Sequence, residues 1–232
     1  MLLDGFTAGP FAANTYVVAP AAGEECLVVD PGLEAERPLA ALLERHGLHP
    51  VAVLLTHGHV DHVATVAPVC ADHGIPAWIH AGDRPMLDDP ASGVGPALAP
   101  LLGGLDLAVP DDVRVLDAAT TSLEVAGLHV SVDHAPGHTP GSVAFRLPGT
   151  GEDGTAGAPV VLSGDLLFAG SIGRTDLPGG DPAQMVESLA RVCLPLPDAT
   201  RVHPGHGPAT TIGRERATNP FLLQVAAQAG PA

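Results

Sequence analysis

The sequence predicts an α/β protein, and two patterns along the chain carry this prediction. Short runs rich in Val, Leu and Ile, typical of buried strands, alternate with segments whose apolar residues recur at helical spacing. Several of these runs end in turns of small residues that carry histidine or aspartate, as at the carboxyl ends of strands in open sheets. The length of 232 residues suits one large domain, and we find no internal repeat, so residues 1–232 are predicted to form a single domain.

Five apolar runs are predicted to be strands, because they are short, rich in β-branched residues and bounded by turn residues. They are CLVVD (26–30), VAVLL (51–55), LHVSV (128–132), SVAFRL (142–147) and VVL (160–162).

Three helices are predicted from their terminal residues. Pro38–His46 has proline in its first turn, leucines on one face and a glycine directly after it. A second helix begins after Asp181, with Gln184 in the position of a capping-box partner. A third runs from a cap near Thr65 to Gly74 and follows an irregular turn.

Two segments rich in glycine and proline are predicted to lie on the surface. Pro90–Pro110 has the composition of a partly ordered lid, and Pro148–Pro159 that of a hairpin loop.

The charge of the chain excludes several function classes. The formal net charge is −16, and all ten basic residues are arginine. A Schiff-base lysine and a phosphate-binding Walker lysine are therefore excluded, and a nucleic-acid partner is not expected because it requires a basic surface. An acidic chain tolerates bound divalent cations.

The sequence favours a cytoplasmic location. Met1–Tyr16 lacks the basic and apolar segments of a signal peptide, and no apolar stretch has the length of a membrane span, so no membrane association is expected. Cys26, Cys70 and Cys193 are far apart and odd in number, and we expect them to be reduced core residues.

Side chains that bind metals gather in four segments, three of which follow predicted strands. THGHVDH (56–62) holds three histidines and an aspartate, and further candidates follow in PGHTPGS (136–142), SGD (163–165) and PGHG (204–207). Because strand ends meet at one sheet edge, we expect one site made of His57, His59, Asp61, His62, His138, Asp165 and His206. Seven ligands exceed the needs of one zinc ion, so two ions are predicted, with Asp165 as the bridge.

These four segments, in this order, resemble the successive signatures of the metallo-β-lactamase superfamily. The resemblance implies an αββα sandwich with a dinuclear metal site at one edge. It also implies that His57, His59 and His138 hold one ion, that Asp61, His62 and His206 hold the other, and that Asp165 touches both. Zinc is the expected metal, with iron or manganese as alternatives, and Asp61 and Asp165 are expected to serve catalysis as well.

GDLLFAGSIGRTDLPGGD (164–181) is most similar to short bacterial proteins of the glyoxalase II type, which are hydroxyacylglutathione hydrolases. Longer enzymes of this type hold glutathione with a C-terminal helical domain, for which the residues after His206 leave no room. Arg174 is therefore the candidate to attract a substrate carboxylate, although pairing with Asp176 or another acid, which would pin this loop, is the favoured role for it. His134 and His203 are candidates for supporting the ligands or for structural roles.

The leading functional hypothesis is hydrolysis of a thioester such as an S-2-hydroxyacylglutathione by a hydroxide that bridges the two metals. The alternative is a persulfide dioxygenase with a single Fe(II), and the third is a metal-binding protein without catalysis. A small-molecule thioester is the expected partner, and the chain is expected to be a monomer or a small homo-oligomer.

Overall fold

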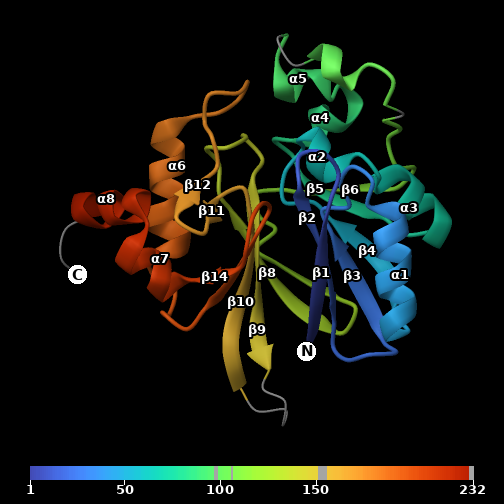
Figure 1. Cartoon of the computed structure of the whole chain (residues 1–232), viewed down its shortest axis with the longest axis horizontal. Coiled ribbons are helices and arrows are strands. Elements are labelled where there is room, and N and C mark those ends of the chain that lie inside the picture. Colours follow the sequence, from blue (N-terminus) through green and yellow to red (C-terminus); the bar gives the residue numbers. More distant parts are fainter. Residues whose placement is uncertain (97–98, 106, 151–155, 230–232) are drawn as a thin grey trace.

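Two six-stranded sheets face each other, and helices cover the outer face of each sheet (Figure 1). The structure is a computed structural model that describes residues 1–96, 99–105, 107–150 and 156–229. The order of layers is helix, sheet, sheet, helix. The predicted α/β class and αββα sandwich are therefore confirmed.

The first sheet is formed by the N-terminal half of the chain. Its strands lie in the order β1 (Leu2–Ala8), β2 (Ala13–Ala19), β3 (Glu25–Val29), β4 (His49–Leu54), β5 (Ala77–His80) and β6 (Val113–Leu116). Neighbours from β1 to β3 are antiparallel, and those from β3 to β6 are parallel. The carboxyl ends of the parallel strands therefore meet at one edge.

The second sheet is formed by the C-terminal half. Its strands lie in the order β14 (Thr210–Thr211), β13 (Arg201–Pro204), β10 (Ala156–Gly164), β9 (Val143–Thr150), β8 (Leu128–His134) and β7 (Ser122–Val125). The pair β10 and β13 is parallel and the other neighbours are antiparallel. A small hairpin of β11 (Leu167–Phe168) and β12 (Ser171–Ile172) follows β10.

The helices are short and fall into two groups along the chain. The first group is α1 (Glu36–His46), α2 (Val60–Val63), α3 (Val66–His73), α4 (Arg84–Asp88), α5 (Ala91–Val94) and the 3-10 turn η1 (Ala99–Leu102). The second group is α6 (Pro182–Ser188), the π-helical turn η2 (Leu189–Cys193), α7 (Ile212–Thr218) and α8 (Pro220–Ala229). No helix in the described ranges combines the length and the apolarity that crossing a membrane requires.

Three apolar clusters hold the layers together. Leu54 and Leu27 of the first sheet pack against Phe145 of the second, which forms the core between the sheets. Leu39 and Leu42 of α1 and residues of α3 cover the outer face of the first sheet, and α6 to α8 cover that of the second. Burial of this apolar surface is the main force that holds the two sheets and their covering helices together.

The predicted strands are all present, and their limits differ by one or more residues. The predicted hairpin loop Pro148–Pro159 is too wide, because β9 continues to Thr150 and β10 begins at Ala156. The middle of that segment, 151–155, lies outside the described residues. Each of the three cysteines is free and buried, as expected.

The three predicted helices are present, but α1 begins at Glu36, two residues before the predicted Pro38, and two details of capping differ. Thr65 precedes α3, but its hydroxyl donates to the carbonyls of Pro31 and Gly32 and caps nothing. The Asp181 carboxylate caps α6, and the Gln184 amide donates to that carboxylate, where a capping box would use a backbone N–H. The irregular turn predicted before α3 contains the short helix α2.

Candidate metal centre

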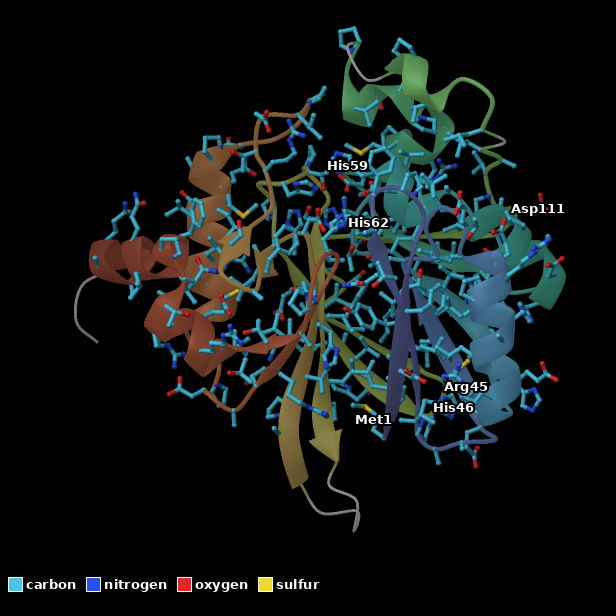
Figure 2. The ribbon with its side chains drawn as sticks, viewed as in Figure 1. Met1, Arg45, His46, His59, His62 and Asp111 are labelled. Atoms are coloured by element: carbon cyan, nitrogen blue, oxygen red, sulfur yellow. The ribbon has the colours of Figure 1, made fainter. Side chains whose placement is uncertain are left out.

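Four strands deliver the candidate ligands to one edge of the sandwich. The loop after β4 carries His57 and His59 and leads into α2, which carries Asp61 and His62. The loops after β8, β10 and β13 carry the remaining three ligand candidates, which are His138, Asp165 and His206. His59 and His62 lie near the upper end of both sheets in Figure 2. Residues from both halves of the chain therefore meet at this edge.

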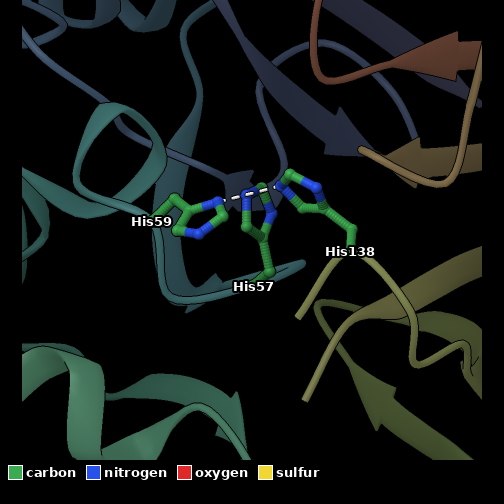
Figure 3. A group of neighbouring side chains, drawn as sticks. All are labelled: His57, His59 and His138. Carbon is green, nitrogen blue, oxygen red and sulfur yellow. Dashed lines mark hydrogen bonds between the residues drawn. The ribbon is translucent and has the colours of Figure 1, made fainter. Parts of the chain in front are cut away.

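The first cluster is formed by His57, His59 and His138. One ring nitrogen from each lies within 4.8 Å of the other two, and the distance from His59 Nδ1 to His138 Nε2 is 2.8 Å (Figure 3). All three rings are buried. The His57 Nε2 atom is buried and has no hydrogen-bond partner among the described residues. These nitrogens point at a common centre, as the ligands of a metal ion do.

The second cluster is formed by Asp61, His62 and His206. The His206 Nε2 atom lies 3.2 Å from both His62 Nε2 and Asp61 Oδ2. His62 is fully buried, whereas His206 keeps about a quarter of its side-chain surface exposed. This set offers two nitrogens and one carboxylate oxygen to a second ion.

Asp165 lies between the clusters. Its Oδ2 is 3.5 Å from His138 Nε2 of the first cluster, and its Oδ1 is 3.6 Å from His62 Nε2 of the second. Asp165 Oδ1 is buried and finds no hydrogen-bond partner within the described part of the chain. The carboxylate therefore has the position that a bridging ligand requires, and its role as a bridge is part of the proposal below.

Each of the five imidazoles is held by the ring nitrogen that does not face its cluster. These contacts join His57 Nδ1 to Thr56 Oγ1 (3.0 Å), His59 Nε2 to the Gly93 carbonyl (3.1 Å), His138 Nδ1 to the Arg174 carbonyl (2.7 Å), His62 Nδ1 to Asp30 Oδ2 (3.0 Å) and His206 Nδ1 to the Ala12 carbonyl (3.3 Å). The carbonyls and the Asp30 carboxylate only accept, and the Thr56 hydroxyl already donates its proton to Asp30, so each partner assigns the proton to the ring nitrogen it contacts. The facing nitrogens then carry lone pairs, and these lone pairs repel one another unless a cation lies between them.

The three imidazoles of the first cluster are neutral at neutral pH, because their pKa values are lowered. Burial, with His62 and His138 nearby, lowers the pKa of His57 well below its usual range. Burial also lowers the pKa of His59 and of His138 to about 4. Neutral imidazole is the form that coordinates a metal ion, so no proton has to leave these rings at neutral pH.

The electrostatic potential at the second cluster is negative, because two carboxylates lie beside His62. Burial lowers the pKa of His62, but the carboxylates of Asp61 and Asp165 outweigh burial and raise it to about 10. Burial opposes ionisation of Asp61, yet His62 and a hydrogen bond from His206 hold its pKa well below its usual range. The field that attracts a proton to His62 also attracts a divalent cation, which would displace that proton.

Asp30 is a supporting residue that the sequence reasoning missed. Its carboxylate accepts hydrogen bonds from the Thr56 backbone N–H (2.8 Å), the Thr56 hydroxyl and His62 Nδ1. It thereby fixes the orientation of His62 and the start of the loop that carries His57. The signal in the sequence was its place at the end of the predicted strand CLVVD. The structure adds that Asp30 has a φ of 50°, which few residue types tolerate.

Asp83 is a second residue that was missed. Its Oδ2 accepts from the Gly58 N–H (2.9 Å) and the Thr139 hydroxyl (2.6 Å), and its Oδ1 accepts from the Gly141 N–H (2.6 Å). Gly58 lies between two candidate ligands of the β4 loop, and Thr139 directly follows the ligand candidate His138. One buried carboxylate therefore joins the two loops that form the first cluster, and no local sequence pattern indicates this contact.

Other histidines take structural roles. His134 stacks on His80 with 4.0 Å between ring centroids and contacts the Pro140 carbonyl. His203 lies edge-on against Tyr16. Neither belongs to a ligand cluster of the described residues.

A cavity of about 390 Å³ opens over both clusters. Arg174 lies on its wall, as expected, but its guanidinium makes two hydrogen bonds to Asp176, of 2.7 and 2.8 Å. The Pro90–Pro110 segment borders the cavity through Val94 of α5 and Leu102 of η1. Positions 97, 98 and 106 of the predicted lid lie outside the described residues. The structure thus shows the pairing role of Arg174, and its contact with a substrate stays a prediction.

The sandwich and the paired clusters at its edge define a metallohydrolase-type architecture, and comparison with known proteins agrees. The family model of the Metallo-beta-lactamase superfamily matches residues 8–206. The chain therefore belongs to this superfamily, whose members bind divalent metals, and the resemblance seen in the four signatures is confirmed at the level of the superfamily.

Individual relatives give finer likenesses. The chain is 36% identical over 199 residues to the hydroxyacylglutathione hydrolase GloC of Haemophilus influenzae, which covers 84% of this chain and 86% of that protein. The structure matches that of the BLEG-1 B3 metallo-beta-lactamase with a TM-score of 0.77 and 37% identity, over 95% of this chain and 99% of the other. It also matches TTHA1623 in a di-iron-bound form, with a TM-score of 0.73 and 43% identity over 94% and 100% of the two chains.

Proposed function

We propose that this protein is a metal-dependent hydrolase of thioesters that works with two divalent ions. His57, His59 and His138 would hold one ion, and Asp61, His62 and His206 the other. Asp165 would bridge them. The observation that carries the proposal is the set of five imidazoles whose outer nitrogens are all held by protein acceptors while their inner nitrogens converge beside two carboxylates.

Two ions bound there would bring the pKa of a water molecule close to neutrality and polarise the carbonyl of the substrate. The protein residues supply the remaining requirements. The cavity over the clusters would hold the substrate with its carbonyl at the candidate ligands, beside the ions that they would bind. A thiolate leaves readily because its pKa is near ~8.5, so a separate acid residue is not needed at the sulfur.

The choice of thioesters is supported by likeness to relatives. GloC of Haemophilus influenzae is named as a hydroxyacylglutathione hydrolase, and it shares 36% identity with this chain over most of its length. The site alone also suits other activated carbonyl compounds, and the likeness to the BLEG-1 β-lactamase agrees with that breadth. We propose zinc as the metal, and the likeness to a di-iron form of TTHA1623 makes iron the first alternative.

The mononuclear persulfide dioxygenase is the competing assignment. A single ion would need only the first cluster or part of it, and would leave Asp61, His62 and His206 without a purpose. Their mutually facing arrangement, with His62 fully buried, therefore favours the hydrolase. We further propose a cytoplasmic protein with a small-molecule substrate, without nucleic-acid or membrane partners, as a monomer or a small homo-oligomer.

Two assays on the same purified protein test the proposal. Thioester hydrolysis is followed by release of free thiol from S-lactoylglutathione and from simple acyl thioesters, and oxygen uptake is followed with glutathione persulfide. The hydrolase predicts thiol release that stops when a chelator removes the metal, with no oxygen uptake. Oxygen uptake by protein with one iron per chain, without thiol release, would replace this proposal by the dioxygenase.

A further inference from the structure

Apolar side chains wall the cavity over the two clusters. Its volume of about 390 Å³ lies in the range of small-molecule sites. The apolar wall is formed by Phe11, Val60, Val94, Leu102, Phe168, Ile172 and Leu177. Polar groups of the cavity are concentrated at its floor, where the candidate ligands lie.

The apolar wall comes from two separate parts of the fold. Val94 belongs to α5 and Leu102 to η1, which lie above the first sheet in Figure 1. Phe168 and Ile172 belong to the β11–β12 hairpin beside α6, on the side of the second sheet. Each of these side chains is only partly buried by the protein itself, so a ligand in the cavity would remove further apolar surface from water.

The described residues of the cavity offer little to attract an anion besides the ions that the two clusters would hold. Arg174 is the cationic side chain of the described wall apart from the histidines, and its guanidinium is already paired in a forked contact with Asp176. The whole chain has a formal net charge of −16, which repels anionic solutes. The described wall therefore offers no unpaired arginine to bind a glutathione carboxylate.

We infer that the site prefers thioesters with an extended apolar acyl group and gains little from an anionic thiol. This inference deepens the proposed hydrolase and depends on it. In the reaction, a water oxygen forms a bond to the acyl carbon and the C–S bond breaks with its electron pair on sulfur. The products are the carboxylate and the thiol, and one proton is released to solvent.

A series of acyl thioesters tests the acyl preference. Acetyl, butyryl, hexanoyl and octanoyl esters of N-acetylcysteamine share a neutral thiol and differ only in chain length. Burial of each added methylene should raise kcat/KM roughly fourfold until the cavity is full. A flat profile over the series would overturn the inference while the hydrolase assignment stands.

Variants of the wall test whether this cavity sets the preference. Val94→Phe should fill part of the cavity and move the best substrate to a shorter chain, and Leu177→Ala should move it to a longer one. Val115→Phe is the matched control, because Val115 lies on β6 outside the cavity with 46% of its surface exposed. If the dependence of kcat/KM on acyl chain length stays unchanged in both wall variants, this cavity does not bind the acyl group.

The preference for the thiol portion of the substrate is tested by comparing a thioester of anionic glutathione with one of a neutral thiol. Hexanoyl-glutathione and hexanoyl-N-acetylcysteamine should be hydrolysed with kcat/KM values within a few fold, and added salt should raise the value for the glutathione ester by screening repulsion. A strong preference for the glutathione ester that weakens with salt would overturn the inference that the site gains little from an anionic thiol.

A binding measurement without turnover tests the apolar acyl site separately from the proposed hydrolase activity. Calorimetry on the metal-loaded protein compares two thioethers that cannot be hydrolysed, S-hexylglutathione and S-methylglutathione. The hexyl compound should bind at least tenfold more tightly, even if no thioester is turned over. Equal affinities would overturn the apolar acyl site, whereas tighter hexyl binding without any hydrolysis would overturn only the proposed function.

Discussion

At the scale of single residues, Asp165 has neighbours in both clusters: its carboxylate oxygens lie 3.5 Å from His138 Nε2 and 3.6 Å from His62 Nε2. Asp165→Ala should therefore loosen both ions and reduce activity more than any other single ligand change. Asp61→Ala should chiefly empty the second position, because the Asp61 carboxylate lies 3.7 Å from His62 Nε2 and 3.2 Å from His206 Nε2. Metal content per chain and thioester turnover are the measurements. Near-normal turnover with full metal content in Asp165→Ala would show that it does not bridge.

Asp83 tests whether the first cluster depends on residues that touch no ligand directly. Asp83→Asn replaces an acceptor of Gly58 N–H and Thr139 O–H by a group that must donate. We expect the free energy of unfolding to fall by about 1–3 kcal/mol and the affinity for the first metal to fall by roughly 10–100-fold. The readouts are urea unfolding and the visible spectrum of the Co(II)-loaded protein.

Glu215→Gln is the matched control for Asp83→Asn. Glu215 is a buried carboxylate that accepts from Gly170 N–H, the Thr210 hydroxyl and the Asn219 amide, and it contacts neither ligand loop. It should lose stability and keep the Co(II) spectrum. The same spectral change in both variants would mean that Asp83 acts only through general stability.

His80 gives the protein a stability that depends on pH. Burial lowers its pKa to about 4, whereas the unfolded chain has a histidine pKa near ~6.5. Below ~6.5 the unfolded chain therefore takes up a proton that the folded chain does not, and the free energy of unfolding falls as the pH falls toward 4. His80→Gln should flatten the curve of unfolding free energy against pH in this window. Parallel curves for the two proteins would refute the role of His80.

At the scale of elements, the sequence was most informative where local rules decide the structure. Pro38 in the first turn and Gly47 after the end located α1, although the helix begins two residues earlier at Glu36, and alternating turns and apolar runs located the strands. The convergence of the seven ligand candidates could be predicted because their residue types and strand-end positions are both local features, and their role as metal ligands stays a prediction. Asp83 and the Asp30 contacts could not be predicted, since they join segments 25 or more residues apart. The extension of β9 and β10 likewise depends on pairing between strands.

The close approach of the His138 loop to α6 is a further element-scale feature that can be tested. Gly137 has a φ of 137°, and a Cβ atom there would lie 2.4 Å from the Met185 backbone of α6. Gly137→Ala should push the loop away from α6 and lower the metal content through His138. Gly74→Ala is the matched control, because Gly74 also has a positive φ of 65° but open space around it. It should lower only the melting temperature, and equal metal loss in both variants would refute the role of this contact.

At the scale of the whole molecule, the metal site joins the two halves of the sandwich. The β4 loop and α2 belong to the first sheet, and the loops of His138, Asp165 and His206 belong to the second. Ions that bind only the folded chain stabilise it by roughly 4 kcal/mol when free metal exceeds the dissociation constant a thousandfold. Chelation should therefore lower the melting temperature by calorimetry, and added zinc should restore it. Equal melting temperatures with and without metal would show that the clusters do not couple the halves.

The central claim, a hydrolase with two metal ions, is tested most directly by titrating metal-free protein with zinc while following hydrolysis of an acyl thioester. The second cluster and the intermediate position of Asp165 predict that activity rises until about two ions are bound per chain and then stays constant. Activity that saturates at one ion per chain, or thioesters that remain intact at full metal occupancy, would contradict the account.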